Sequence, residues 1–217
     1  MRPSLHTHRE PARPTGPGPT TARPSRASKA GIPAEIEALK ADHVIFQKLL
    51  RVFESELALF HDGEKPVDYE IMRDVMHYVT NYPDRRHHPM EDLIFGRLLQ
   101  VEPAAQRPVE DLRKEHEWLA TTGTELLHLL DEIASDAMIS RDSVESLART
   151  YLQRLRAHMD QEEATLFPMA AERLSPEDWA ALTVAGKRLG DPLFGGAQAD
   201  QKYRAIRERL GAAEFTA

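Results

Sequence analysis

Six nitrogen- and oxygen-bearing side chains recur along this chain at positions where they could hold metal ions. They are four histidines and two glutamates: His43, His87, Glu91, His116, His158 and Glu162. His87 precedes Glu91 by four residues, as His158 precedes Glu162, so each pair projects from one face of a helix. Imidazole with carboxylate suits iron, with zinc or manganese as competitors. The chain has no cysteine, which excludes thiolate metal sites, iron–sulfur clusters, disulfides and thiol nucleophiles.

The segments that carry these residues are predicted to be long helices separated by short breaks that contain glycine or proline. Their expected ranges are about 33–61, 67–100, 108–137 and 141–173. No two-residue alternation favours a β-sheet, and short connections make consecutive helices antiparallel neighbours. We therefore expect an all-α fold, an antiparallel up-down-up-down four-helix bundle with extra C-terminal helices at about 176–189 and 200–210.

Each long segment has an inward stripe of residues at alternating spacings of three and four, and the histidines lie in these stripes. The stripe of the last segment contains Val144, Leu147, Tyr151, Leu155, His158, Glu162, Thr165 and Met169. A helix rises about 1.5 Å per residue, which places all six candidate ligands at roughly one level of the bundle. A single buried histidine is most often an ordinary core residue. Four on four helices, with two buried carboxylates, would be costly unless a cation pairs with them.

The second segment departs from a regular helix because it contains two prolines. Pro83 and Pro89 each remove a backbone donor, so a kink or bulge is expected there. Its stripe still brings His87 and Glu91 to the inside. Four histidines and two glutamates are too many donors for one tetrahedral zinc ion. They fit two octahedral ions, with each glutamate bridging and positions left for an oxo bridge, water or a small ligand.

The candidate ligands lie in four short motifs: Asp42-His43; His87-His88-Pro89-Met90-Glu91; Glu115-His116; and His158-Met159-Asp160-Gln161-Glu162-Glu163 with Leu166-Phe167-Pro168. Together these motifs resemble the hemerythrin-like (HHE cation-binding) domain family over about residues 35–175. The resemblance implies a non-haem di-iron centre with two iron ions bridged by an oxo or hydroxo group. The four histidines would be terminal ligands, and Glu91 and Glu162 would bridge.

The sequence departs from the oxygen-carrying members of that family at two positions. Those proteins have a second histidine one turn away on the third helix, where this chain has Leu112 and Ala120. Their last carboxylate follows its histidine by five residues, which would select Glu163, whereas the stripe and the repeated spacing favour Glu162. The ligand set is more similar to that of iron–sulfur repair proteins and of iron- and oxygen-sensing proteins. This chain lacks the cysteine-bearing N-terminal segment that is usual in the repair proteins.

The expected function is that of a non-haem di-iron protein that binds, senses or reacts with a small ligand: oxygen, nitric oxide or peroxide. If it is an enzyme, a di-iron oxidoreductase reactive toward peroxide or nitric oxide is expected. The alternative is an iron-handling or iron- and oxygen-sensing regulatory protein without turnover, and the third possibility is a structural bundle without metal.

Other polar residues are expected outside the ligand set. His88 lies about 100° around the helix from His87, so we expect it beside the site or on the surface. Tyr151 is expected in the core. Glu125 and His128 form the one Glu-x-x-His element, but both are off the stripe. A ferritin-type site needs two such elements and is not expected.

Composition and helix pattern predict three regions: a disordered basic tail at 1–31, a bundle at 32–174 and a helical extension at 175–217. The tail has six prolines and six basic residues against one acidic residue, so the rest of the chain is more acidic than the overall net charge of −7. An acidic body argues against a nucleic-acid partner. No apolar run approaches the roughly 18 residues of a membrane span. No apolar signal core precedes the bundle, so the cytoplasm is expected; a protein partner is not identified.

Overall fold

The structure is a computed structural model that describes residues 32–62, 66–135, 138–186 and 204–214 of the 217-residue chain. The expected tail at 1–31 and the residues at 187–203 lie outside the described residues. The described elements are helical: α1 (Ala34–Asp62), α2 (Tyr69–Tyr82), η1 (Pro83–His87), α3 (His88–Val101), η2 (Pro103–Ala105), α4 (Gln106–Ala134), α5 (Arg141–Gln161), η3 (Glu162–Leu166), α6 (Phe167–Arg173), α7 (Pro176–Ala185) and α8 (Arg204–Glu214). No strand is present within these ranges. The all-α prediction is confirmed.

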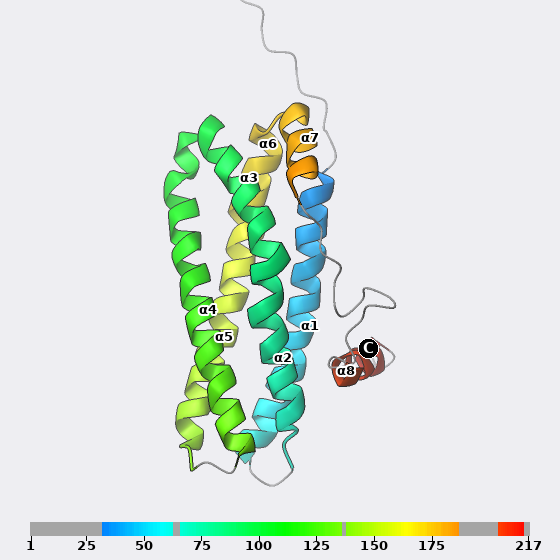
Figure 1. Ribbon diagram of the computed structural model, residues 1–217, viewed down its shortest axis with the longest axis vertical. Helices are drawn as coiled ribbons and strands as arrows, with labels where there is room; N and C mark the ends of the chain where they lie inside the picture. Colours follow the sequence, from blue (N-terminus) through cyan, green and yellow to red (C-terminus); the bar gives the residue numbers. More distant parts are fainter. Residues whose placement is uncertain (1–31, 63–65, 136–137, 187–203, 215–217) are drawn as a thin grey trace, which may run out of the picture. The chain divides into compact units, whose positions relative to one another are not determined.

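The long helices form rods that lie side by side (Figure 1). They are α1, α2 continued by α3, α4, and α5 continued by α6. The α2 helix packs against α1 and α4, and α5 also packs against α1 and α4, so the rods surround one interior. The end of α1 and the start of α2 lie at the lower end in Figure 1, whereas α3 ends and α4 starts at the upper end. The α7 helix packs on α3, and α8 contacts α1 and α2.

Side chains at the helix starts explain where several elements begin. The hydroxyl of Ser140 accepts a hydrogen bond from the backbone N–H of Ser143 at the start of α5. Ser175 and Asp178 form the reciprocal capping box at the start of α7 that the sequence predicts. The third rod begins earlier than expected, because the 3₁₀ turn η2 leads directly into α4 at Gln106. Pro108 is tolerated there because the N–H groups in the first turn of a helix have no hydrogen-bond acceptor within the helix, so the missing N–H of proline costs no hydrogen bond.

Two π-helical turns interrupt the second and fourth rods, each just before a proline-containing helix start. The turn η1 is the bulge that the prolines of the second segment predict. The turn η3 was not predicted, although Pro168 follows it in the same way that Pro89 follows η1. A π-helical turn contains one extra residue, so the inward positions move from 165 and 169 to 166 and 170. The prediction was therefore wrong for Thr165, which is exposed, and for Met169, which is half-buried.

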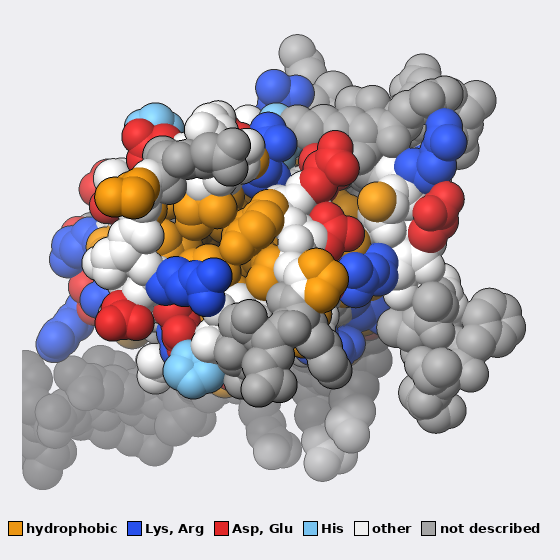
Figure 2. Space-filling model, turned by 90° about the horizontal axis from the view of Figure 1, so that it is seen from below, with side chains coloured by type: hydrophobic (Ala, Val, Ile, Leu, Met, Phe, Trp, Pro, Cys, Tyr) orange, Lys and Arg blue, Asp and Glu red, His pale blue; other side chains and the backbone are white. Residues whose placement is uncertain are grey.

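Within the described ranges the buried hydrophobic residues form two clusters, and the candidate ligands lie between them along each rod. One cluster contains Phe46, Leu119 and Leu155; the other contains Leu39, Leu112 and Leu166. On α1 these residues flank His43, and on α4 they flank His116. Figure 2 views one end of the bundle, where hydrophobic side chains gather in the middle and charged side chains surround them. The polar cluster is thus a layer within an otherwise apolar interior.

None of the helices in the described ranges combines the length and the apolar character that crossing a membrane requires.

Candidate metal centre

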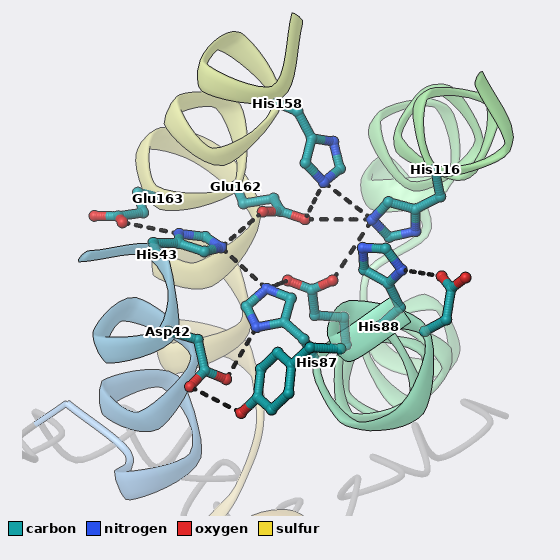
Figure 3. A network of polar contacts seen from close by, with 11 residues as sticks. Asp42, His43, His87, His88, His116, His158, Glu162 and Glu163 are labelled. Atoms are coloured by element: carbon teal, nitrogen blue, oxygen red, sulfur yellow. Dashed lines mark hydrogen bonds and ion pairs between the residues drawn. The ribbon is translucent and has the colours of Figure 1, made fainter. Parts of the chain in front are cut away.

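The structure brings all six sequence-predicted site residues together from the four rods (Figure 3). His43 comes from α1, His87 from the last position of η1, His116 from α4 and His158 from α5. Glu91 follows on α3, and Glu162 is the first residue of η3. The side chains of Glu91 and Glu162 are fully buried, and that of His116, the most exposed of the six, is 14% exposed. That these residues ligate a metal stays a prediction, but their convergence satisfies its first geometric requirement.

The four histidines form two pairs whose ring nitrogens face each other. Nε2 of His43 lies 3.1 Å from Nε2 of His87, and Nε2 of His116 lies 3.0 Å from Nε2 of His158. Two nitrogens bound to one ion at right angles, with bonds of about 2.1 Å, are about 3.0 Å apart. Both pairs therefore have the spacing of neighbouring ligands on one ion.

Each buried carboxylate extends from one histidine pair to the other. The Oε1 atom of Glu91 is 3.0 Å from Nε2 of His87, and its Oε2 atom is 3.6 Å from Nε2 of His116. Glu162 spans the same gap, with Oε2 3.2 Å from Nε2 of His43 and Oε1 3.2 Å from Nε2 of His158. Each glutamate thus presents one oxygen to each pair.

The buried oxygens of these glutamates lack hydrogen-bond partners. Both carboxylate oxygens of Glu91 and both of Glu162 are unsatisfied, as is Nδ1 of His158. Buried polar atoms are nearly always hydrogen-bonded, and a buried carboxylate without a partner is strongly unfavourable. A cation among the convergent lone pairs would satisfy these oxygens. The residues present therefore fit a metal site of nitrogen and oxygen donors.

Outer carboxylates hold the far nitrogens of the first histidine pair. Nδ1 of His87 hydrogen-bonds to Asp42 at 3.2 Å, and the hydroxyl of Tyr82 donates to the same carboxylate at 3.3 Å. Nδ1 of His43 hydrogen-bonds to Glu163 at 2.9 Å, and Lys40 pairs with Glu163 at 3.4 Å. Such contacts fix the ring orientation and would leave the lone pair of Nε2 available to a metal ion. Asp42 and Glu163 were not predicted in this role, although both adjoin a predicted ligand in the sequence.

The same contacts separate the roles of the two neighbouring glutamates on the last rod. Glu162 lies at the centre of the cluster with its side chain fully buried. Glu163 points to the outer face of His43 and its side chain is 31% exposed. The structure therefore places Glu162 between the histidine pairs and Glu163 behind one of them.

His88 lies beside the cluster, as expected, and it is partly buried in contact with one of the candidate ligands. Its side chain is 18% exposed, and its ring stacks on that of His116 with the centroids 3.9 Å apart. Nδ1 of His88 hydrogen-bonds to Asp84 at 3.1 Å. Its potential ligand atom lies within 4.8 Å of those of His116 and His158. Tyr151 is buried, as predicted, and Glu125 and His128 are exposed.

The electrostatics of the two buried glutamates are opposite in the metal-free cluster. Burial raises the pKa of Glu162 well above its ordinary value, and the nearby charge of Glu91 raises it further. Burial also acts to raise the pKa of Glu91, but the charge of His87, whose Nε2 atom is 3.0 Å away, outweighs burial and lowers that pKa. One carboxylate is thus held ionised and its neighbour protonated, because two negative charges cannot share this interior without a cation.

Three of the candidate histidines are neutral in the metal-free cluster. Burial, followed by the charge of His87, lowers the pKa of His43 to about 4. Burial, followed by the charge of His88, lowers the pKa of His116 to about 3. The pKa of His158 is lowered in the same way, by burial and then by His116. His87 is the exception: burial acts to lower its pKa, but Glu91 and Asp42 outweigh burial and raise it to about 9. Neutral imidazoles are the form that binds metal.

A cavity of about 20 Å³ adjoins the cluster. Its lining includes His88, His158, Thr80 and Tyr151. A water molecule needs about 10–15 Å³ of such volume, so the cavity has room for a molecule of a few atoms. Gly123 faces this region from α4, and a Cβ atom there would lie 2.5 Å from Cγ2 of Thr80 and 3.1 Å from Cε2 of Tyr151. The absent side chain therefore lets α4 approach these two residues closely.

Comparison with known proteins identifies the family. The family model described as the hemerythrin HHE cation binding domain matches residues 30–170. An uncharacterized protein of Haemophilus influenzae is 33% identical over 104 residues, which cover 48% of this chain and 57% of that protein. The chain therefore spans little more than half the length of this relative. No solved structure matches the chain. Because the family match covers well over half of the chain and contains the whole buried cluster, the protein belongs to the hemerythrin HHE cation-binding domain family.

Proposed function

We propose that the protein binds two iron ions between its four rods and that the resulting centre binds, senses or reacts with oxygen, nitric oxide or peroxide. The observation that carries the proposal is the position of the two buried glutamates. Each offers one oxygen to the His43–His87 pair and the other to the His116–His158 pair. Two carboxylates that span two imidazole pairs match a pair of ions better than a single ion.

The donor set supports iron as the metal. Two carboxylates and four imidazoles suit iron, zinc or manganese, and no thiolate is present to favour a soft metal. Iron supplies Lewis acidity and one-electron oxidation and reduction, which are the properties that small oxygen- and nitrogen-containing ligands engage.

The surrounding residues prepare the site for a small ligand. Asp42 and Glu163 orient the first pair of imidazoles, and the apolar clusters on either side keep bulk water out of the interior. The cavity beside His158 restricts access to molecules of a few atoms. Burial, and then the charge of Asp84, raises the pKa of the Tyr151 hydroxyl. This hydroxyl therefore keeps its proton and is available as a hydrogen-bond donor at the cavity wall.

The metal content of the protein tests the first part of the proposal. Protein purified from iron-supplied cells is analysed for iron, zinc and manganese per chain. We expect about two iron ions per chain, in line with the two groups of donors. Well under one metal of any kind per chain would reject the proposal in favour of a structural bundle.

The reaction of the reduced iron protein with each ligand tests the second part. Oxygen, nitric oxide and hydrogen peroxide are mixed separately with reduced protein while absorption spectra are recorded. At least one should change the spectrum at stoichiometric amounts, and Tyr151→Phe should alter the rate or affinity of that reaction because it removes the cavity hydroxyl. Unchanged spectra with all three would rule out the small-ligand role.

A regulatory role without turnover is supported by a separate observation. Among the residues that the structure describes, five buried polar atoms are unsatisfied without a cation, so metal occupancy is expected to be coupled to the stability of the bundle. A protein of this kind would report iron or oxygen through loosening of its helices. Hydrogen exchange with and without metal tests this role. Protection should fall around η1 and η3 when metal is removed, and equal protection in both forms would exclude the mechanism.

A further inference from the structure

His87 and His88 are consecutive in the sequence, yet they belong to different groups of potential ligands. One group contains His43, His87, Glu91 and Glu162, and the other contains His88, His116 and His158. Within each group the ligand atoms lie within 4.8 Å of one another. His88 is the first residue after the π-helical turn η1, whose last residue is His87. The end of this turn therefore directs one imidazole to each histidine pair.

The contacts of His88 repeat those of the predicted ligands. Its Nδ1 atom hydrogen-bonds to Asp84, as Nδ1 of His87 does to Asp42 and Nδ1 of His43 does to Glu163. The Asp84 carboxylate accepts this hydrogen bond from Nδ1–H of His88, so Nε2 is the ring nitrogen that is left to bind a metal. A histidine that donates its outer N–H to a carboxylate is the usual arrangement of a metal ligand.

The ring of His88 also lies against the rings of both His116 and His158. It stacks on the His116 ring, with an interplanar angle of 25°, and lies edge-on to the His158 ring at a centroid distance of 6.4 Å. It is one of the side chains that line the cavity beside the cluster. A purely covering role would need the stacked ring alone and would not need the Asp84 contact.

We propose that His88 is a fifth imidazole ligand and that it completes the metal position formed by His116 and His158. The inference rests on the proposed binding of two metal ions. The two positions are then unequal: three imidazoles serve the His116–His158 position and two serve the His43–His87 position. The two bridging glutamates are common to both.

Counting coordinated imidazoles in the unaltered protein tests the proposal directly. The metal-free full chain is loaded with Co²⁺, and metal content and proton NMR are measured together. Each coordinated imidazole gives one strongly shifted, exchangeable N–H signal, because its second ring nitrogen bears a proton. Five such signals are expected, and four would overturn the role of His88. Failure of the unaltered protein to bind any metal would instead remove the proposed function, and the present inference with it.

A substitution that keeps the ring but removes its nitrogens provides the second test. His88→Phe retains an aromatic ring to stack on His116, and His128→Phe on the exposed face of α4 is the control. Co²⁺ titration should show one site in His88→Phe weakened by about 100-fold or more, beyond the usual effect of an outer contact, while the other site and the control are unchanged. Two sites of unaltered affinity in His88→Phe would overturn the proposal. If this variant does not fold, the signal count in the unaltered protein decides.

Discussion

Two adjacent glutamates show how one residue position decides the role of a carboxylate. Glu162 is fully buried between the two histidine pairs, whereas Glu163 is partly exposed and contacts His43 and Lys40. The position of Glu162 suits the neutralisation of the proposed metal ions, whereas Glu163 orients an imidazole. The two residues are consecutive on the same rod, so their roles differ because their side chains point in different directions around the helix axis.

We therefore predict unequal effects for the two amide substitutions. Glu162→Gln removes the charge that faces both pairs and should reduce iron from about two ions per chain to about one or fewer. Glu163→Gln keeps an acceptor for Nδ1 of His43 and should weaken metal binding by about tenfold at most. Metal analysis and competition with a chelator measure both effects. Equal losses in the two variants would contradict the roles assigned to them.

A second prediction compares two histidines of α4. His116→Ala removes a member of the buried cluster and should lower iron occupancy strongly. His128→Ala alters an exposed side chain that lies near Glu132 and should leave occupancy unchanged. Iron is measured in both proteins after purification under identical conditions. A similar iron content in the two variants would contradict the assignment of His116 as a ligand.

At the scale of elements, the close approach of α4 to α2 depends on a residue without a side chain. Gly123 faces Thr80 of α2, and Thr80 is itself held by a hydrogen bond from its hydroxyl to the carbonyl of Met76 at 2.7 Å. Tyr151 of α5 fills the same region. The wall of the cavity beside the cluster is therefore set by how closely three rods pack.

We predict that Gly123→Ala destabilises the protein despite the better helix propensity of alanine. Overpacking in a core costs about 1–3 kcal/mol, and the propensity gain offsets up to about 1 kcal/mol of this. Thr80→Ser removes the methyl group that the new Cβ would meet, so the double variant should recover most of the lost stability. Thermal or urea unfolding of the single and double variants measures this coupling. Purely additive effects would mean that these two groups do not meet.

At the scale of the whole molecule, a polar layer divides the hydrophobic core. The stability of the folded protein is expected to depend on whether a cation is bound in this layer. The layer contains unsatisfied carboxylate oxygens and three histidines with lowered pKa values. A bound cation stabilises the folded state by an amount that grows with the logarithm of its concentration divided by the dissociation constant, and reaches about 4 kcal/mol when this ratio is a thousand. Removal of metal by a chelator should therefore lower the melting temperature, and iron should restore it.

The metal-free protein should lose stability as the pH falls from 6.5 toward 4. In the unfolded state His43 and His116 have the ordinary histidine pKa of 6.5, so they take up protons as the pH falls through this range. In the folded state their pKa values are about 4 and about 3, so they stay neutral. The unfolded state thus binds more protons, which favours unfolding in acid. His158, whose pKa is also lowered, takes up a proton on unfolding in the same way. Glu162 has a raised pKa and releases a proton on unfolding, which opposes the trend, but it is one group and the three histidines outweigh it.

Chemical unfolding of the metal-free protein at pH 6.5, 5.5 and 4.5 measures this dependence. His43→Leu should reduce the acid sensitivity, because it removes one of the groups that take up a proton on unfolding. Above pH 6.5 the sign reverses for His87, whose pKa of about 9 in the folded state contributes stability that is lost as the pH rises toward that value. An unfolding midpoint that does not change between pH 6.5 and 4.5 would contradict the prediction.

The sequence by itself determined which residues share an interior and at what level. The spacing of apolar residues along each segment sets the direction of a side chain around its helix, and the rise per residue sets its height. For this reason the all-α fold and the convergence of the six donors could be predicted from the sequence. The kink or bulge near Pro83 could be predicted because proline lacks a backbone N–H donor.

Only the tertiary structure decided how those donors meet. The division of the histidines into two pairs, the direction of each oxygen of Glu91 and Glu162, and the contacts of Asp42 depend on which rods lie opposite one another. The shift of the inward face after η3 depends on a local rearrangement of backbone hydrogen bonds. The stacking of His88 on His116 joins two helices that periodicity treats separately. Periodicity describes each helix about its own axis, whereas ligand geometry arises from side-chain conformations and contacts between helices.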